Sequence, residues 1–204
     1  KPSGNVLLNK KTANKLLPLL RKQNYINEAE IYSNQKIDID LDFFRETQIS
    51  VNFHSIRWYS QLVGVPIDMN KKYLEVEESK LFKNKIVIVR SQRYRNIFIN
   101  YKFLESLKDV VCIGLKDEFD DLKRDIKNLE FYDCKDFLEM AEIIKSSKFF
   151  IGNQTFAYSL AEGLKTKRLL ENCPEFPLVF PNGENAFDFF HQIHFEKYFN
   201  KLNN

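Results

Sequence analysis

The chain has 204 residues, 44% hydrophobic and 29% charged, a composition typical of a soluble globular protein with one large domain or two small ones. Its formal net charge of +3 is too small to indicate nucleic-acid binding, but it leaves room for anionic substrates or for lipid headgroups at the inner face of a membrane. No apolar run reaches the roughly 20 residues of a membrane span, and the three cysteines are far apart without a CxxC pair, so we expect a cytoplasmic protein without a disulfide framework.

The first eighty residues have an irregular pattern that predicts a small α/β part. Leucines between Thr12 and Arg21 predict a helix capped by Thr12 and interrupted by Pro18. A second helix is predicted over residues 52–63, closed by Gly64. Short apolar or alternating runs predict strands at residues 29–32, 37–41 and 73–76. We therefore expect residues 1–80 to form a smaller, incomplete N-terminal α/β part.

The remainder of the chain, residues 81–204, alternates strand-like runs with helical patterns. The β-branched run at residues 86–89 is typical of a strand buried on both faces. Further strands are predicted at residues 110–113, 129–132, 149–151 and 168–170, and helices at residues 97–108, 117–126, 137–145, 155–164 and 186–202. Five strand–helix alternations predict an α/β fold with a Rossmann-like, doubly wound parallel sheet, separated from the N-terminal part near residues 80–84.

A polar turn follows the predicted strand at residues 149–151, and it consists of Gly152, Asn153, Gln154 and Thr155. Gly152 allows a tight turn, and the free amides at the start of the next helix attract an anion with the help of the helix dipole. Because ligands of such sheets bind at the carboxyl ends of the strands, this turn is a candidate phosphate site. The alternative is that Asn153 and Thr155 only cap a helix.

A second candidate is the segment RSQRYRN, which follows the buried strand at residues 86–89. Arg90 and Arg93 can bind phosphate in the bidentate manner that guanidinium groups favour, and Tyr94 can stack on a base. We expect this loop to face the turn at Gly152 and to bind the diphosphate of a nucleotide or nucleotide-sugar. The alternative is a solvated charged loop without a ligand.

Two carboxylates are expected near the same edge of the sheet. Glu162 lies on the helix after the turn and Glu171 ends the last predicted strand, so both can accept ribose or sugar hydroxyls; the alternative is that they are ordinary surface acids. His191 and His194 share a helical face, but no acidic or cysteine partner completes a metal site. The sequence has no Walker-type loop, no GxGxxG and no GxSxG, and we predict neither a metal nor a cofactor.

The segment FIGNQTFAYSLAEGLKTKRLLE, residues 150–171, resembles the donor-binding motif of the heptosyltransferase family, the lipopolysaccharide glycosyltransferases of GT-B fold. The family pattern runs Asn-Asp-Thr/Ser-Gly, followed by His, Ala and Ala, and Leu-Gly. The positions that match are Asn153, Thr155, Leu160, Ala161 and Leu164, and those that depart are Gln154 for Asp, Phe156 for Gly and Ser159 for His. With the segments LLPLLRKQNYI and RYRN, the resemblance covers most of residues 81–204 and, loosely, residues 10–80.

The resemblance implies two Rossmann-like halves that face each other across a cleft. The C-terminal half, here residues 81–204, would bind the nucleotide-sugar, and the N-terminal half would bind the acceptor. Transfer in this family needs no metal, because amides and basic side chains stabilise the leaving diphosphate. The family's first strand, its glycine-rich loop and the nearby acidic base have no counterpart in residues 1–80, so the catalytic base stays unassigned.

Three hypotheses follow for the function. The first is a metal-independent glycosyltransferase that moves a sugar from a nucleotide-diphosphate donor to a glycan or a lipid-linked acceptor, at the inner face of the membrane in the latter case. The second is a non-catalytic relative that binds a nucleotide or a glycan or holds a partner protein. The third is a nucleotide-binding α/β protein unrelated to sugars. The sugar, the acceptor and the oligomeric state are not predicted.

Overall fold

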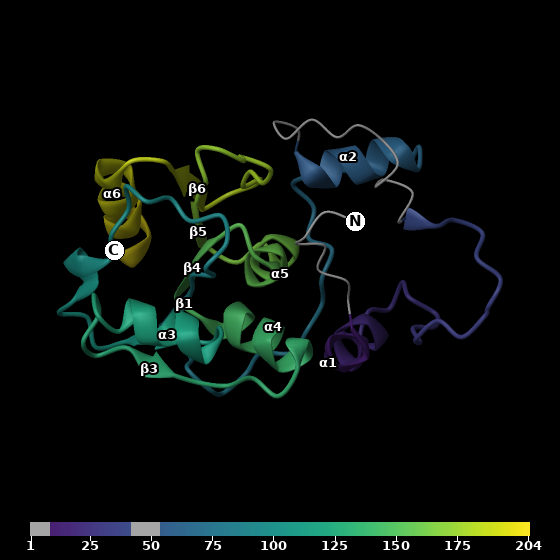
Figure 1. Ribbon diagram of the computed structural model, residues 1–204, viewed down its shortest axis with the longest axis horizontal. Coiled ribbons are helices and arrows are strands. Elements are labelled where there is room, and N and C mark those ends of the chain that lie inside the picture. The colour runs from purple at the N-terminus through teal and green to yellow at the C-terminus, as the bar shows by residue number, and fades with distance from the viewer. Residues whose placement is uncertain (1–8, 42–53) are drawn as a thin grey trace.

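The computed structural model describes residues 9–41 and 54–204. Six strands form one parallel sheet in the order β3-β2-β1-β4-β5-β6 (Figure 1). The strands are β1 (Ile86–Val89), β2 (Val110–Cys112), β3 (Glu130–Phe131), β4 (Phe149–Asn153), β5 (Arg168–Glu171) and β6 (Ala186–Phe189). This order is that of the Rossmann-like, doubly wound sheets, so the predicted fold class is confirmed at this level.

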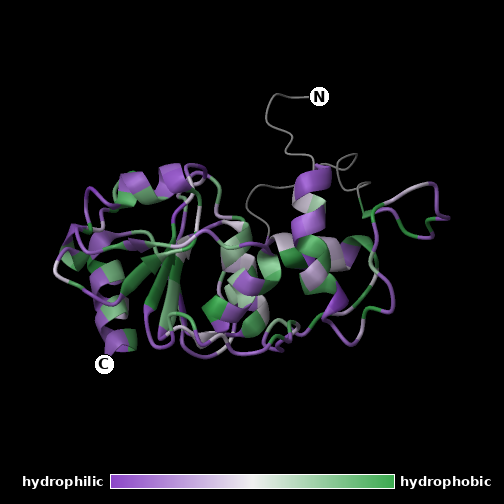
Figure 2. Cartoon of the chain, turned by 90° about the horizontal axis from the view of Figure 1, so that it is seen from below, coloured by the Kyte–Doolittle hydropathy of each residue, from purple (hydrophilic) through white to green (hydrophobic). Residues whose placement is uncertain are grey.

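Helices cover both faces of the sheet. The helices that pack on the sheet are α1 (Lys10–Arg21), α3 (Lys116–Leu122), α4 (Phe137–Ser146), α5 (Phe156–Leu164) and α6 (Gln192–Asn203). Another helix, α2 (Ser55–Leu62), has no buried residue. Alternate residues of each strand point to opposite faces, so Val87 and Val89 pack with α1, α4 and α5, whereas Ile86 and Ile88 pack with α3 and α6. Figure 2 shows apolar strands between these layers. Burial on both faces explains the continuous β-branched run of β1, which is buried throughout.

The N-terminal residues pack onto the same core as the sheet. Residues 9–41 and 54–80 contribute α1 and α2 but no strand, so the strands predicted at residues 29–32, 37–41 and 73–76 are wrong. In the last of these, Tyr73 and Leu74 donate their backbone N–H groups to the carbonyl of Gly163, at 3.0 and 3.1 Å, and the chain crosses α5 instead of joining the sheet. Leu74 is buried in the core cluster that also contains Leu19 of α1.

The two predicted N-terminal helices exist with different ends. α1 begins earlier than predicted because Asn9, rather than Thr12, is the cap: its side chain accepts the Thr12 N–H at 2.9 Å. The helix continues through Pro18. α2 begins at Ser55, and residues 52 and 53 of the predicted helix lie outside the described residues. Gly64 follows the end of α2 with φ of 66°, the left-handed conformation that favours glycine at this position.

Two predictions in the second half of the chain are wrong for local reasons. The helix predicted at residues 97–108 is an irregular segment with one 3-10 turn, η2 (Lys102–Leu104). The side chains of Asn96 and Asn100 accept the N–H groups of Phe98 and Lys102 two residues ahead, which competes with helical hydrogen bonding. The helix predicted at residues 186–202 is β6 followed by α6, so the sheet has a sixth strand.

Among residues 9–41 and 54–204, no helix combines the length and the apolar character needed to cross a membrane.

Candidate functional site

The candidate site lies where the chain order of the sheet reverses, between β1 and β4. Ligands of open α/β sheets bind outside the carboxyl ends of the strands at this point. Val89 of β1 pairs with Gly152 of β4, so the loops that begin at Arg90 and at Asn153 leave the sheet together. A Cβ atom at Gly152 would lie 2.9 Å from the Val89 carbonyl oxygen and 2.7 Å from the Phe150 ring, so a residue with a side chain does not fit at this position without a shift of its neighbours.

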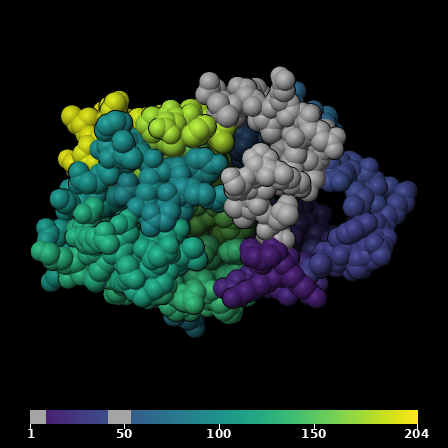
Figure 3. All heavy atoms as spheres, viewed as in Figure 1, coloured from purple at the N-terminus to yellow at the C-terminus, as the bar shows by residue number. Residues whose placement is uncertain are grey.

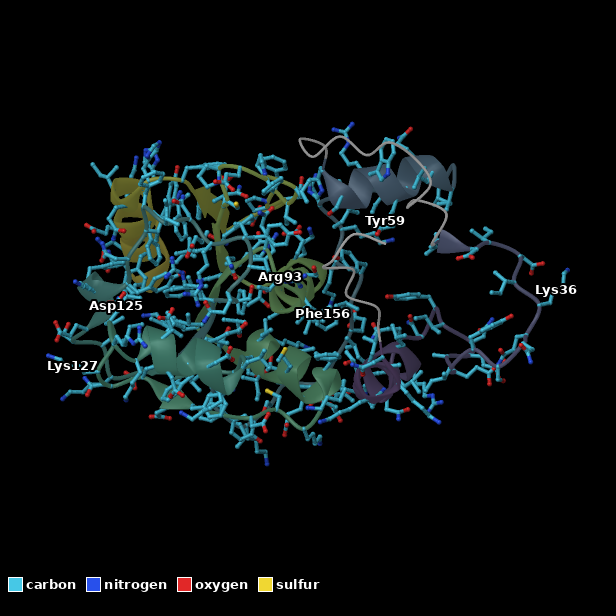
Figure 4. All side chains as sticks on the ribbon, in the orientation of Figure 1. Lys36, Tyr59, Arg93, Asp125, Lys127 and Phe156 are labelled. Carbon is cyan, nitrogen blue, oxygen red and sulfur yellow. The ribbon has the colours of Figure 1, made fainter. Side chains whose placement is uncertain are left out.

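A cavity of about 500 Å³ opens at this edge, within the range of about 300–1,000 Å³ that small-molecule sites occupy. Figure 3 shows the hollow between the teal atoms of the segment after β1 and the purple atoms of α1, with green atoms of α5 deep inside. Arg93 and Phe156, labelled in Figure 4, both line it. The other lining residues are Lys11, Thr12, Lys15, Val89, Ser91, Ile113, Gly114, Leu115, Glu118, Asp133, Cys134, Asp136, Phe137, Met140, Gln154, Thr155 and Ala157.

Asn153 fixes the loop after β1 and does not line the cavity. Its side chain is fully buried, accepts the Ser91 N–H at 2.9 Å, and donates to the carbonyl oxygens of Ser91 at 3.1 Å and Arg93 at 2.6 Å. Tyr94, the next residue in this loop, adopts φ of 56°, which is uncommon for a residue with a side chain. Its ring packs edge-on against Phe176. Asn153 thus holds the loop in the conformation that presents Arg93.

The side chains of Gln154 and Thr155 also bind other parts of the chain. Gln154 accepts the N–H groups of Leu178 and Val179, at 2.8 and 3.0 Å, and donates to the Phe176 carbonyl at 2.8 Å. The hydroxyl of Thr155 accepts the Tyr158 N–H at 3.2 Å and so caps α5. What the turn offers to a ligand is therefore its backbone rather than its polar side chains.

The first two amides of α5 point toward the cavity end of the helix. Within residues 9–41 and 54–204, the N–H groups of Phe156 and Ala157 have no acceptor, and both residues line the cavity. Three helices, α3, α4 and α5, begin at this edge of the sheet. The first turns of α3 and α4 contain acidic residues, whereas that of α5 contains none. An external anion is consequently most favourable at α5.

The arginines of the RSQRYRN segment have different surroundings. Arg90 forms a buried ion pair with Glu171, at 2.7 and 2.9 Å, and does not line the cavity. Arg95 pairs with Asp121. Arg93 is exposed, forms no ion pair within the described ranges, and lies with its guanidinium 5.9 Å from the Tyr94 ring centre. Arg93 is therefore the arginine of this loop with a side chain available to a ligand in the cavity.

Glu171 belongs to a buried network outside the cavity lining. Besides Arg90, its carboxylate accepts the Asn96 N–H at 2.7 Å and the Tyr101 hydroxyl at 3.0 Å. Arg90 donates further to the carbonyls of Asn96 and Ile99 and lies over the Tyr101 ring. Burial, followed by the charge of Glu171, raises the pKa of Tyr101 well above its usual value. The network ties the loop after β1 to the end of β5.

Glu162 is also buried and lies outside the cavity lining. Its carboxylate accepts from Arg168, at 2.7 Å, and from Lys165. Lys165 and Arg168 both donate further to the Asn182 carbonyl, so this cluster holds the segment between β5 and β6 against α5. The sequence-predicted pair of carboxylates therefore divides between two separate internal ion-pair clusters.

Glu118 lines the cavity and was missed by the sequence analysis. Its carboxylate is largely buried, accepts the Leu115 N–H at 3.0 Å, and has a pKa raised by burial. The sequence signal that could have identified Glu118 is its place as an acidic residue shortly after the strand predicted at residues 110–113. Cys134 also lines the cavity, but burial raises the pKa of its thiol to about 12, which disfavours the thiolate and hence nucleophilic chemistry.

In the part of the chain that the structure describes, no group of three or more His, Cys, Asp and Glu side chains is placed to hold a metal ion. His191 and His194 lie with ring centres 6.0 Å apart at the start of α6. Neither a family model nor a curated protein matches the chain.

Proposed function

We propose that the cavity between the ends of β1 and β4 binds the diphosphate of a nucleotide-sugar, as the donor site of a GT-B-like glycosyltransferase related to the heptosyltransferases. The observation that carries this proposal is the joint position of Arg93 and the open amides of α5 in one cavity at the reversal point of the sheet. The resemblance of residues 150–171 to the heptosyltransferase donor-binding motif is the reason to propose a nucleotide-sugar as the ligand of this cavity.

In this proposal, the diphosphate lies at the start of α5. The N–H groups of Phe156 and Ala157 donate to its oxygens, and Arg93 adds a charge-assisted, bidentate contact. These groups stabilise the negative charge that develops on the diphosphate as the bond to the sugar breaks. Glu118, in the first turn of α3, can accept a hydrogen bond from a ligand hydroxyl. Arg90, Asn153 and Glu171 support the loops and do not contact the ligand.

The test is calorimetric titration of the chain with UDP, ADP, GDP and CDP and with their glucose conjugates. We expect at least one compound to bind, and we expect Arg93→Ala to weaken its binding about tenfold or more, since hydrogen bonds to charged groups contribute roughly 1.5–3 kcal/mol. Arg124→Ala is the matched control, because Arg124 lies just after α3 with its side chain 81% exposed and outside the cavity lining. The absence of millimolar or tighter binding by every compound overturns the proposal.

A second candidate function, a binding module without transferase activity, is favoured by the three departures from the family motif. Gln154 stands where the family has an acidic residue, and its side chain forms hydrogen bonds with the backbone of the segment 176–179. Phe156, in place of glycine, puts an aromatic ring, 43% exposed, at the cavity. Release of nucleoside diphosphate from a bound nucleotide-sugar, measured with and without glycan acceptors, separates the two functions: turnover supports the transferase, and binding without turnover supports the module.

A further inference from the structure

The cavity has a second cationic wall that the proposed diphosphate site does not use. Lys11 and Lys15 line it from α1, on the side away from the loop that carries Arg93. The two lysines are four residues apart and therefore lie on one face of the helix. In Figure 1, α1 lies beside α4, and Figure 3 shows the hollow between α1 and the segment that follows β1. Residues distant in sequence thus supply positive charge from two directions.

α1 is firmly attached, so its lysines have a defined place. Leu19 is 2% exposed and belongs to the core cluster of α4 and α5. Gln23, just after the helix, donates to the carbonyls of Leu19 and Glu75, at 2.8 and 3.1 Å, and accepts the Glu75 N–H at 2.8 Å. Lys11 and Lys15 are consequently carried by a helix that is anchored in the core, and their positions do not depend on a loop.

No carboxylate of the described residues binds Lys11 or Lys15. Neither Lys11 nor Lys15 forms an ion pair in the described ranges; the Lys15 ammonium lies 3.5 Å from the Cys134 carbonyl oxygen. Three carboxylates also line the cavity, but two are engaged at helix starts: Glu118 accepts the Leu115 N–H, and Asp136 accepts the Glu139 N–H at 2.9 Å. These backbone hydrogen bonds hold Glu118 and Asp136 at the helix starts, and none of the three carboxylates forms an ion pair with Lys11, Lys15 or Arg93 in the described ranges.

We infer that the ligand is anionic at both ends: a nucleotide-sugar whose sugar carries its own carboxylate or phosphate, bound by Lys11 and Lys15 while Arg93 and α5 bind the diphosphate. This inference rests on the proposed function, because it assigns the sugar end of the same ligand. It predicts selection of acidic over neutral sugars, since a neutral sugar would leave the lysine charges without a partner.

Two matched pairs of ligands test it, and one pair has no nucleotide. The pairs are UDP-glucuronic acid with UDP-glucose, and glucose 1,6-bisphosphate with glucose 1-phosphate. The wild-type chain is expected to bind the acidic member of at least one pair about fivefold or more tightly than its partner, the size that two partly solvated ion pairs provide. Lys11→Ala and Lys15→Gln are expected to remove that preference, so that the two members of a pair bind with nearly equal affinity. Thermal unfolding midpoints close to that of the wild-type chain show that the variants are folded.

Lys10→Ala is the control, because Lys10 is on the same helix with the same charge and does not line the cavity. Its preference should equal that of the wild-type chain. Equal binding of both members of each pair overturns this inference and leaves the diphosphate site standing. A preference that survives in Lys11→Ala and Lys15→Gln overturns the assignment to α1. If no member of either pair binds, the inference fails, and the nucleotide panel decides separately whether the proposed function fails with it.

Discussion

Arg90 and Arg93 lie in the same short loop, yet one belongs to a buried region and the other to a cavity wall. Arg90 is 8% exposed and donates to Glu171 and to two carbonyls, so its charge is neutralised inside the protein. Arg93 is exposed and forms no such pair within the described residues. The comparison teaches that an arginine-rich loop after a parallel strand can have two tasks: one residue fixes the loop and another contacts the ligand.

The same division exists in the turn after β4. The side chains of Asn153, Gln154 and Thr155 bind the loops around the cavity, and the backbone amides at the start of α5 remain for an anion. Stability and binding should therefore respond to different substitutions, although the residues are neighbours. The predictions below test that separation, beginning with the largest expected effect.

Removal of Glu171 should have the largest effect on stability. Glu171→Ala leaves the buried guanidinium of Arg90 without its carboxylate, and breaking a buried pair costs about 3–5 kcal/mol. Urea unfolding of the variant measures the loss. Glu77→Ala is the control, because its carboxylate pairs with Lys22 at the surface with 77% of the side chain exposed, and it should cost about 0.5 kcal/mol or less. A loss below about 1 kcal/mol for Glu171→Ala would contradict the account of the network.

A smaller loss is expected for Gly152→Ala. The added methyl group would lie 2.9 Å from the Val89 carbonyl oxygen, a backbone atom that cannot move without shifting β1 against β4. Overpacking of this kind costs about 1–3 kcal/mol. Because the displaced strands carry both loops of the cavity, ligand affinity should fall together with the unfolding free energy. Unchanged stability would mean that β1 and β4 are not so close at this position.

Loss of the α5 cap should cost about 1 kcal/mol, the usual value for a capping hydroxyl. Thr155→Ala removes the acceptor for the Tyr158 N–H, whereas Thr155→Ser keeps the oxygen. Urea unfolding should therefore separate the two variants, with serine close to the wild-type chain. Equal losses for alanine and serine would assign the effect to the methyl group rather than to the cap.

Arg93→Ala should change stability least, by about 0.5 kcal/mol or less, as is usual for a surface substitution. Arg90→Ala, its counterpart in the same loop, should cost several times more, because Glu171 then remains buried without its guanidinium. Thermal unfolding of the two variants side by side is the measurement. A similar loss for both would remove the distinction between the structural arginine and the ligand-facing one.

The sequence predicts the sheet better than the connections between its strands. β1 and β4 are found because β-branched and aromatic residues run continuously where both faces are covered. β6 was missed because its Phe-rich residues merge with the helix that follows. The helix predicted at residues 97–108 does not form, because asparagine side chains accept hydrogen bonds from nearby backbone N–H groups. Helix propensity does not predict this competition.

The strand order locates the candidate site at one edge of the sheet. It does not predict which residues there contact a ligand and which support the loops. Whether Arg90 or Arg93 is buried depends on Glu171, about eighty positions away, which no local pattern reveals. The contribution of α1 to the cavity depends on its packing against α4, a tertiary contact between segments far apart in the chain. These long-range contacts could be seen only in the structure.

The most direct test of the central claim is an amide NMR titration of the chain with the best nucleoside diphosphate of the panel. If the diphosphate lies at the start of α5, the N–H resonances of Phe156 and Ala157 shift the most and those of Ser91 and Arg93 follow, and Arg93→Ala reduces these shifts at equal ligand concentration. Shifts confined to residues outside the cavity, with Phe156 and Ala157 unchanged at saturation, would contradict the claim.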